Sequence, residues 1–251
     1  MKKIIYAIAI LAAATLAFSC GKDKPEDKKV QKRLAMCGDD WDKYYFTYNE
    51  DGSLASALRN PAEDGTYERT WTFTWAGKVG TAAYVKEGEA KGNWVFTFGD
   101  NGYLSTLANE WGDTWAFTYD NAGYLTKIVR SDKDPVQVKS NCVWENGDLK
   151  KWSRFNDGVE QFKMQTFLDD ENVAGIFPDA CDKADVARWI FELGYCGKPS
   201  KHLLDQAAWD GTNQVAVQEY TKDDDGFVTK VSKVFDGGDP EFYYYTWEVL
   251  K

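Results

Sequence analysis

A hairpin-like stretch recurs along this chain of 251 residues and constrains its fold more than any other feature. Residues 115–130 read WAFTYDNAGYLTKIVR, and residues 94–109 read WVFTFGDNGYLSTLAN, a near copy. Looser copies begin at Tyr44, Trp71, Asn141 and Val217. Each copy has a glycine near its middle, and these are Gly52, Gly77, Gly102, Gly123, Gly147 and Gly226. Recurrence at so short a period predicts one repeated supersecondary unit.

Each copy has the pattern of a β-hairpin. In WAFTY, residues 115–119, aromatic side chains alternate with Ala and Thr, a period of two that places the aromatics on one face of a strand. Asp120 and Asn121 can bond the backbone of a turn, and Gly123 can adopt a positive φ, so the chain reverses here. YLTKIV, residues 124–129, then returns as the second strand.

Successive hairpins without long crossovers pair with their neighbours, which predicts a mainly β fold, an antiparallel meander of about a dozen or more strands. A sheet this wide must curl, close into a barrel or protect its edges. A degenerate copy begins at Phe162 and has Asn172 in the glycine position. We therefore expect a large curled or barrel-like sheet.

One insertion, residues 178–211, interrupts the repeat. Apolar side chains at helical spacing predict a helix over about 182–195, capped by Asp182, that lies over one mouth or face of the sheet. A loop over 197–208 should follow. The apolar positions are Val186, Trp189, Ile190 and Leu193.

Residues 1–19 have the features of a secretory signal, because Lys2 and Lys3 precede an apolar run too short to span a bilayer comfortably. The run ends in LAFSC, residues 16–20, which resembles the lipobox of bacterial lipoproteins. We therefore expect Cys20 to carry acyl chains that anchor the mature chain. An ordinary cleaved signal with an incidental cysteine is the alternative.

The mature chain is acidic. The full sequence has a formal charge of −10, and removal of 1–19 with its two lysines leaves −12. Such a surface repels nucleic acid and anionic lipid, so attachment must come from the acyl chains. Residues 20–36 are charged and predict a lipid-anchored tether, and 37–251 predict a single β-repeat domain. We expect the protein at the bacterial outer membrane.

Four cysteines follow Cys20, namely Cys37, Cys142, Cys181 and Cys196. Export and an even count favour two disulfides, for which three connectivities are open. We expect Cys181 to pair with Cys196 because both flank the predicted helix, which leaves Cys37 to pair with Cys142. The sequence has no CxxC motif and a single histidine, so zinc is disfavoured.

The repeated unit resembles the YD repeats of large bacterial shell and wall proteins. Almost all of the mature chain more closely resembles a family of Bacteroidetes lipoproteins described as having a porin-like β fold. This resemblance rests on the lipobox, the charged tether, the Tyr-x-Tyr-Asp-x-x-Gly-x-Leu hairpins and a late loop with Gly197, Ser200, Lys201 and Leu203. It implies a large antiparallel barrel or half-barrel and no established activity.

Porin-like shape does not require a membrane-spanning barrel. Spanning strands need about nine to eleven residues and an apolar face toward lipid. We expect shorter strands here, and one face of the repeats carries Thr, Ser, Lys and Glu. The prediction is a barrel that does not span the membrane.

Motifs of catalysis are missing from the sequence. There is no GxSxG, HExxH, P-loop or GxGxxG motif. Ser200 and Lys201 adjoin His202, the single histidine, but adjacent loop residues do not face one another as a nucleophile and base must. Residues 221–232 lack acidic ligands at both ends of a calcium loop. We expect no enzyme, cofactor or metal.

Aromatic residues make up 16% of the chain and are the remaining functional signal. If they face a curled interior they fill a core, whereas on an open concave face they offer platforms for sugar rings or small apolar ligands. We expect a non-catalytic envelope lipoprotein that binds such a ligand; a structural lipoprotein that contacts another envelope protein is the alternative, and a hydrolase is third. The candidate ligand-face residues are Trp71, Trp75, Trp94 and Trp115.

Overall fold

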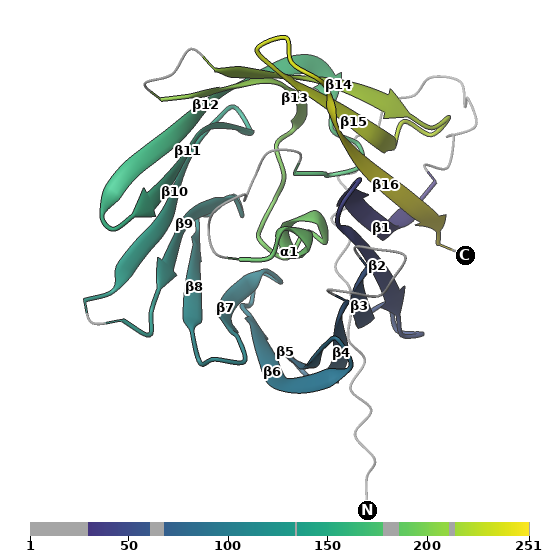
Figure 1. The fold of residues 1–251 in the computed structure, drawn as a ribbon, viewed down its shortest axis with the longest axis vertical. Helices are drawn as coiled ribbons and strands as arrows, with labels where there is room; N and C mark the ends of the chain where they lie inside the picture. Colours follow the sequence, from purple (N-terminus) through teal and green to yellow (C-terminus); the bar gives the residue numbers. More distant parts are fainter. Residues whose placement is uncertain (1–29, 61–67, 134, 178–185, 211–213, 251) are drawn as a thin grey trace, which may run out of the picture.

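A computed structural model of the protein describes residues 30–60, 68–133, 135–177, 186–210 and 214–250. Within them, sixteen strands form one closed antiparallel barrel in which neighbours in sequence pair and β1 pairs with β16 (Figure 1). This confirms the mainly β, barrel-like meander. The strands are β1 (Lys32–Asp39), β2 (Lys43–Tyr48), β3 (Leu54–Asn60), β4 (Arg69–Ala76), β5 (Val79–Lys86), β6 (Glu89–Phe98), β7 (Leu104–Ala108), β8 (Thr114–Tyr119), β9 (Leu125–Arg130), β10 (Gln137–Glu145), β11 (Asp148–Asn156), β12 (Val159–Glu171), β13 (His202–Trp209), β14 (Val215–Lys222), β15 (Val228–Phe235) and β16 (Glu241–Val249).

The repeated glycines lie in turns at one end of the barrel, which we call the glycine mouth; the other end is the opposite mouth. In the turn between β8 and β9, Gly123 has φ 91° and its N–H donates to Asp120 O at 3.1 Å. Asp120 Oδ1 accepts the N–H groups of Ala122 and Tyr124, both at 2.9 Å. Side chain and glycine thus fix the reversal together. All six have positive φ: Gly52, Gly77, Gly102, Gly123, Gly147 and Gly226.

An aromatic residue just before the turn ties one hairpin to the preceding one. Tyr119 donates its hydroxyl hydrogen to Leu104 O at 2.7 Å, and the strand register shifts at Thr118/Tyr119. Such bulges increase strand twist and bending, so a bulge repeated along the chain helps the sheet to close. Equivalent bonds of 2.6–2.7 Å are made by Tyr48, Trp75, Trp144, Tyr220 and Trp247.

The inserted helix fills the barrel. The short helix α1 (Arg188–Glu192) lies in the middle of the ring of strands (Figure 1), and Trp189, Ile190 and Phe191 are each 0% exposed. The prediction of a helix over 182–195 that covers a mouth or face was therefore wrong in length and position. Inward side chains of a wide barrel leave space at its axis, and the insertion supplies apolar volume there. Asp182 lies outside the described residues.

A buried carboxylate fixes α1 to the wall. Glu192 Oε1 accepts hydrogen bonds from Arg188 Nε and from the Tyr245 hydroxyl, both at 3.2 Å. Its Oε2 accepts the N–H of Phe177 at 3.0 Å. A buried charge needs such partners, and here they join the helix to β16 and to the chain that enters the lumen.

After α1 the chain runs along the glycine mouth as a strap, residues 195–201. Tyr195 O accepts Leu104 N–H at 2.8 Å, and the N–H groups of Lys198 and Lys201 donate to Gly123 O and Gly147 O at 3.0 and 2.9 Å. The strap then enters β13, so the loop predicted over 197–208 is mostly strand. The sequence did not indicate this strand, because no repeated turn glycine marks it.

Two further expectations are corrected. Gly175, with φ 68°, takes the glycine position of the degenerate copy, while Asn172 takes the Asp position and its Oδ1 accepts Ile176 N–H at 3.1 Å. β1 begins at Lys32, so residues 32–36 belong to the barrel rather than to the predicted tether. Residues 1–29, with Cys20, lie outside the described residues.

The predicted pairing of Cys37 with Cys142 was wrong. Both are free, buried thiols, and they lie on β1 and β10, on opposite sides of the ring (Figure 1). A disulfide requires Cα atoms within about 7 Å, which opposite walls do not allow. Cys196 is also a free, buried thiol, and its predicted partner Cys181 lies outside the described residues.

The outward positions of the strands are largely polar. Thr72, Thr74, Thr118 and Thr246 are exposed and alternate with buried aromatic residues. Several strands are longer than expected, with 13 residues in β12, but the polar outer face was anticipated. Among the described residues, no helix is both long and apolar enough to cross a bilayer.

Candidate functional site

An open groove lined by aromatic rings crosses part of the glycine mouth. Two adjoining cavities, of about 480 and 380 Å³, share Gly52 and Tyr195 in their walls. We call them together the aromatic groove. Its rings come from the ends of β2, β4 and β6, from β16 and from the strap, and they are Tyr48, Trp75, Phe98, Trp247 and Tyr195.

The central rings form a ladder. The centroid of Phe98 lies 5.8 Å from that of Trp75 and 5.0 Å from that of Tyr195, the second pair edge to face at 85°. Trp75 Nε1 donates to Leu54 O at 2.7 Å, which fixes its ring plane. A Cβ on Gly80 would lie 2.8 Å from that ring, so the glycine gives Trp75 its space. The platform is therefore built before any ligand arrives.

Charged and polar groups surround the rings. Lys78 and Asp100 form an ion pair at one end of the groove, and this contact lowers the pKa of Asp100. At the other end, hydrogen bonds to Asp223 and Asp225 raise the pKa of Lys32. The groove thus offers apolar faces between polar ends.

Three of the four predicted ligand-face residues are in the core. Trp71, Trp94 and Trp115 are 3%, 9% and 3% exposed, so a ligand cannot reach their faces. Trp75 alone of the four lines the groove. The expectation was therefore wrong for three residues, which belong to the hydrophobic core.

The loop with the single histidine has a structural role, because it attaches the strap to the barrel wall. His202 Nδ1 lies 2.9 Å from Asp148 Oδ2, and Asp148 Oδ1 accepts His202 N–H at 3.0 Å. Ser200 Oγ accepts the N–H of Leu149 at 3.0 Å. These bonds hold the strap to the turn between β10 and β11. In the described part of the chain, no three His, Cys, Asp or Glu side chains are placed to bind a metal ion together.

No protein-family model and no curated protein matches this sequence. Its fold resembles solved structures. A porin-like protein from Bacteroides uniformis ATCC 8492 is 20% identical, with a TM-score of 0.64 over 82% of this chain and 91% of that one. A porin-like protein from Bacteroides vulgatus ATCC 8482 is 10% identical, with a TM-score of 0.46 over 88% of this chain and 100% of that one.

The first similarity confirms a porin-like fold, as the sequence resemblance implied. At 20% identity it speaks for the fold alone. Membership of a lipoprotein family stays a prediction.

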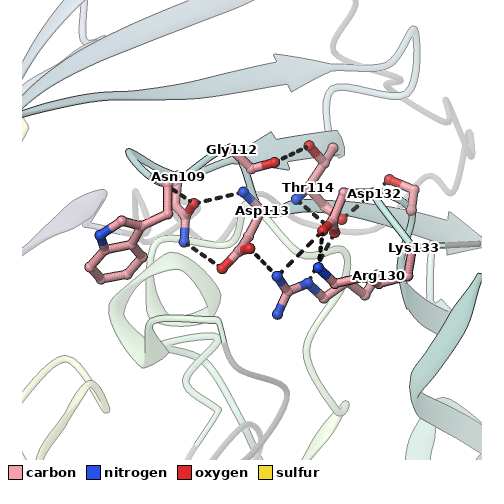
Figure 2. Close-up of polar contacts among 9 residues, drawn as sticks. Asn109, Gly112, Asp113, Thr114, Arg130, Asp132 and Lys133 are labelled. Atoms are coloured by element: carbon pink, nitrogen blue, oxygen red, sulfur yellow. Dashed lines mark hydrogen bonds and ion pairs between the residues drawn. The ribbon is translucent and has the colours of Figure 1, made fainter.

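At the opposite mouth, an exposed aromatic residue lies on a turn that is held by several hydrogen bonds. Trp111 is 75% exposed, and its N–H and that of Asp113 donate to Asn109 Oδ1 at 3.0 and 2.9 Å. Arg130 binds both Asp113 and Asp132 (Figure 2), and its hydrogen bond lowers the pKa of Asp132. The turn is therefore rigid while its indole faces solvent.

The groove residues share a signal that the sequence interpretation missed. Tyr48, Trp75 and Phe98 are each the last or next-to-last residue of the first strand of a hairpin, beside the turn. An aromatic at that place lies at the mouth, whereas one four residues earlier lies deep in the barrel. Tyr195 carried no such signal, because its place depends on the path of the strap.

Proposed function

We propose that this chain is a non-catalytic, lipid-anchored binding protein of the bacterial outer membrane that holds a glycan in the aromatic groove. The ladder of Trp75, Phe98 and Tyr195 at the surface carries this proposal. Apolar faces of sugar rings stack on aromatic side chains, while hydroxyl groups bond polar neighbours. Ser53, Lys78 and Asp100 border the same cavity.

The filled lumen favours a glycan over a small apolar ligand. Pockets that hold small apolar molecules bury about 70–90% of the ligand surface. Here α1 occupies the barrel axis, with Trp189 packed against Phe46, Phe73 and Phe96. A ligand that is long and partly solvated suits an open groove better than one that must be enclosed.

The polar exterior supports attachment by lipid rather than by insertion of the barrel. Exposed Thr72, Thr118 and Thr246 lie where a membrane barrel requires an apolar band. Cys20 precedes β1 by a short charged stretch, so acyl chains on it would hold the barrel close to the membrane surface.

Replacing the groove indole should weaken glycan binding. For the chain from Gly21, which keeps every strand from Lys32 to Val249, we expect Trp75→Ala to weaken binding of a glycan-array hit about tenfold or more, because the stacking platform is lost. Isothermal titration calorimetry measures the change.

Trp144→Ala is the matched control. Trp144 is the next-to-last residue of β10, the first strand of another hairpin. It donates the same bond, to Leu125 O at 2.7 Å, but it does not line the aromatic groove. Its variant should bind the glycan as the native chain does. Equal loss in both variants, or no hit on arrays of neutral and acidic polysaccharides, would contradict glycan binding.

The anchor is tested separately. Labelled palmitate should enter the full-length protein in bacterial cells and should fail to enter Cys20→Ala, because the acylated cysteine is gone. Cys142→Ala is the control and should label normally, since this thiol is buried in the barrel. Equal labelling of Cys20→Ala and the native protein would rule out the anchor.

A protein partner is the second candidate function. Trp41 and Trp111, 81% and 75% exposed, favour it, because exposed aromatics are enriched at protein interfaces. Both lie at the opposite mouth, so Trp111→Ala should leave glycan binding unchanged. Substitutions at the two mouths of the barrel can thus distinguish glycan binding from partner binding.

A further inference from the structure

Three cations lie side by side at the opposite mouth. Arg69 on β4 is directly paired with Arg59 on β3 and with Lys86 on β5. All three share the inward face, because the next inward pairs, Ala57 with Trp71 and Trp71 with Tyr84, are buried. Like charges directly opposite each other destabilise a sheet, so this row requires a compensating charge.

Among the described residues, carboxylates lie beside the two outer cations of the row, Arg59 and Lys86, but not beside the central one, Arg69. Arg59 forms a two-pronged contact with Asp42, with Nη2 at 2.5 and 2.6 Å from the two oxygens. Lys86 Nζ lies 3.9 Å from Glu87 Oε1. Among the described residues, no carboxylate forms an ion pair with Arg69. In a chain with a net charge of −10, this uncompensated cation is unusual.

Three buried N–H donors on β4 and on the adjoining α1 have no acceptor in the described part of the chain. Arg69 Nε and Trp71 Nε1 are buried and have no hydrogen-bond partner among the described residues. Trp189 Nε1 is also buried and has no hydrogen-bond partner among the described residues. The centroid of the Trp189 ring lies 5.6 Å from that of Trp71. These groups only donate, and a buried donor without an acceptor destabilises the folded state. The guanidinium of Arg69 lies nearest the mouth, and its unsatisfied donor favours an acceptor with negative charge there.

We infer that the opposite mouth binds a carboxylate between Arg69 and Lys86. The planar fork of an arginine matches the two oxygens of a carboxylate. The ligand is either a small free carboxylate or the acidic group of a glycan. This site is at the other end of the barrel from the aromatic groove and does not depend on it.

Iodide is a suitable probe because it is an anion that quenches indole emission. The chain from Gly21 with Trp41→Phe and Trp111→Phe lacks the two most exposed indoles. At constant ionic strength, we expect iodide quenching to saturate and sodium acetate to reverse it competitively. Arg69→Gln should remove the saturating part, and Lys86→Gln should weaken iodide affinity several-fold.

Arg154→Gln is the control, because Arg154 lies on β11 and forms a solvent-exposed hydrogen bond with Gln161, far from this row. It should leave the saturating quench unchanged. Circular dichroism checks that each variant is folded, and if Arg69→Gln unfolds, Lys86→Gln still decides the matter. Two results would overturn the site. One is linear quenching of the chain that carries only Trp41→Phe and Trp111→Phe, and the other is a saturating quench that survives both Arg69→Gln and Lys86→Gln.

The source of the carboxylate follows from competition. A glucuronic-acid oligosaccharide that displaces iodide at least tenfold better than acetate would support a glycan ligand. Equal displacement by both would support a small free carboxylate. Failure of both to displace iodide would contradict a carboxylate site.

Discussion

Trp189→Ala is expected to lower the free energy of unfolding of the chain from Gly21 by about 3–5 kcal/mol. Trp189 is 0% exposed at the barrel axis, and its ring lies 5.6–6.4 Å from those of Phe46, Trp71, Phe73 and Phe96. Removing the indole leaves a cavity that rigid strands on all sides cannot close. Because native domains are stable by about 5–15 kcal/mol, this loss would be a large fraction of the total.

Urea denaturation measures this effect, and Trp111→Ala is its control. Trp111 is 75% exposed, so its variant should change stability by no more than about 0.5 kcal/mol. The slope of the unfolding free energy with urea should stay the same in both variants. A Trp189→Ala protein as stable as the control would show that α1 does not fill the lumen.

Gly38→Ala should have an effect of similar size for a different reason. Gly38 is in β1 next to the connection to β2, and a Cβ there would lie 2.0 Å from Asp42 O and 2.6 Å from Lys43 Cα. Both obstacles are backbone atoms, so a rotamer change cannot relieve the clash. We expect a loss of about 3 kcal/mol or more, since the connection must rebuild.

Gly52→Ala is the matched comparison. Gly52 has φ 85°, but a Cβ there would meet nothing within 4 Å. Its variant should carry only the cost of the left-handed conformation, about 1–2 kcal/mol. The difference between the two melting curves isolates the steric term. Equal losses would mean that the turn at residues 39–42 is not as tight as described.

The hairpins could be predicted from sequence because their determinants are local. Asp120 and Gly123 lie within one turn, and their bonds close within residues 120–124. Closure into a barrel was left open, since it depends on bulges such as Thr118/Tyr119 and on pairing of β1 with β16, the most distant strands in sequence.

The site was harder to predict because alternation identifies a face but not a depth. Trp71 and Trp75 share the inward face of β4, yet one is core and the other lines the groove. Four residues of strand correspond to about 13 Å along the barrel, enough to move a ring from the buried interior to the mouth. Distance from the turn was the missing criterion.

The predicted Cys37–Cys142 pairing and the predicted helix position failed because sequence spacing does not report position around a closed ring. Cys37 and Cys142 were paired by elimination, and the barrel places them on opposite walls. The helix was expected to cover the sheet because apolar spacing shows only that one side is buried. The surrounding wall buries all sides of Trp189 and Ile190.

Amide hydrogen exchange of the chain from Gly21 tests most directly whether the repeated hairpins close around an inserted plug. The N–H of Leu193 donates to Trp189 O at 3.0 Å inside the lumen, and that of Leu104 donates to Tyr195 O at 2.8 Å where the strap meets the wall. We predict that both amides exchange as slowly as those of β8 and β9, through unfolding of the whole barrel. Exchange of Leu193 and Leu104 at the rate of exposed turn amides would contradict a plugged barrel.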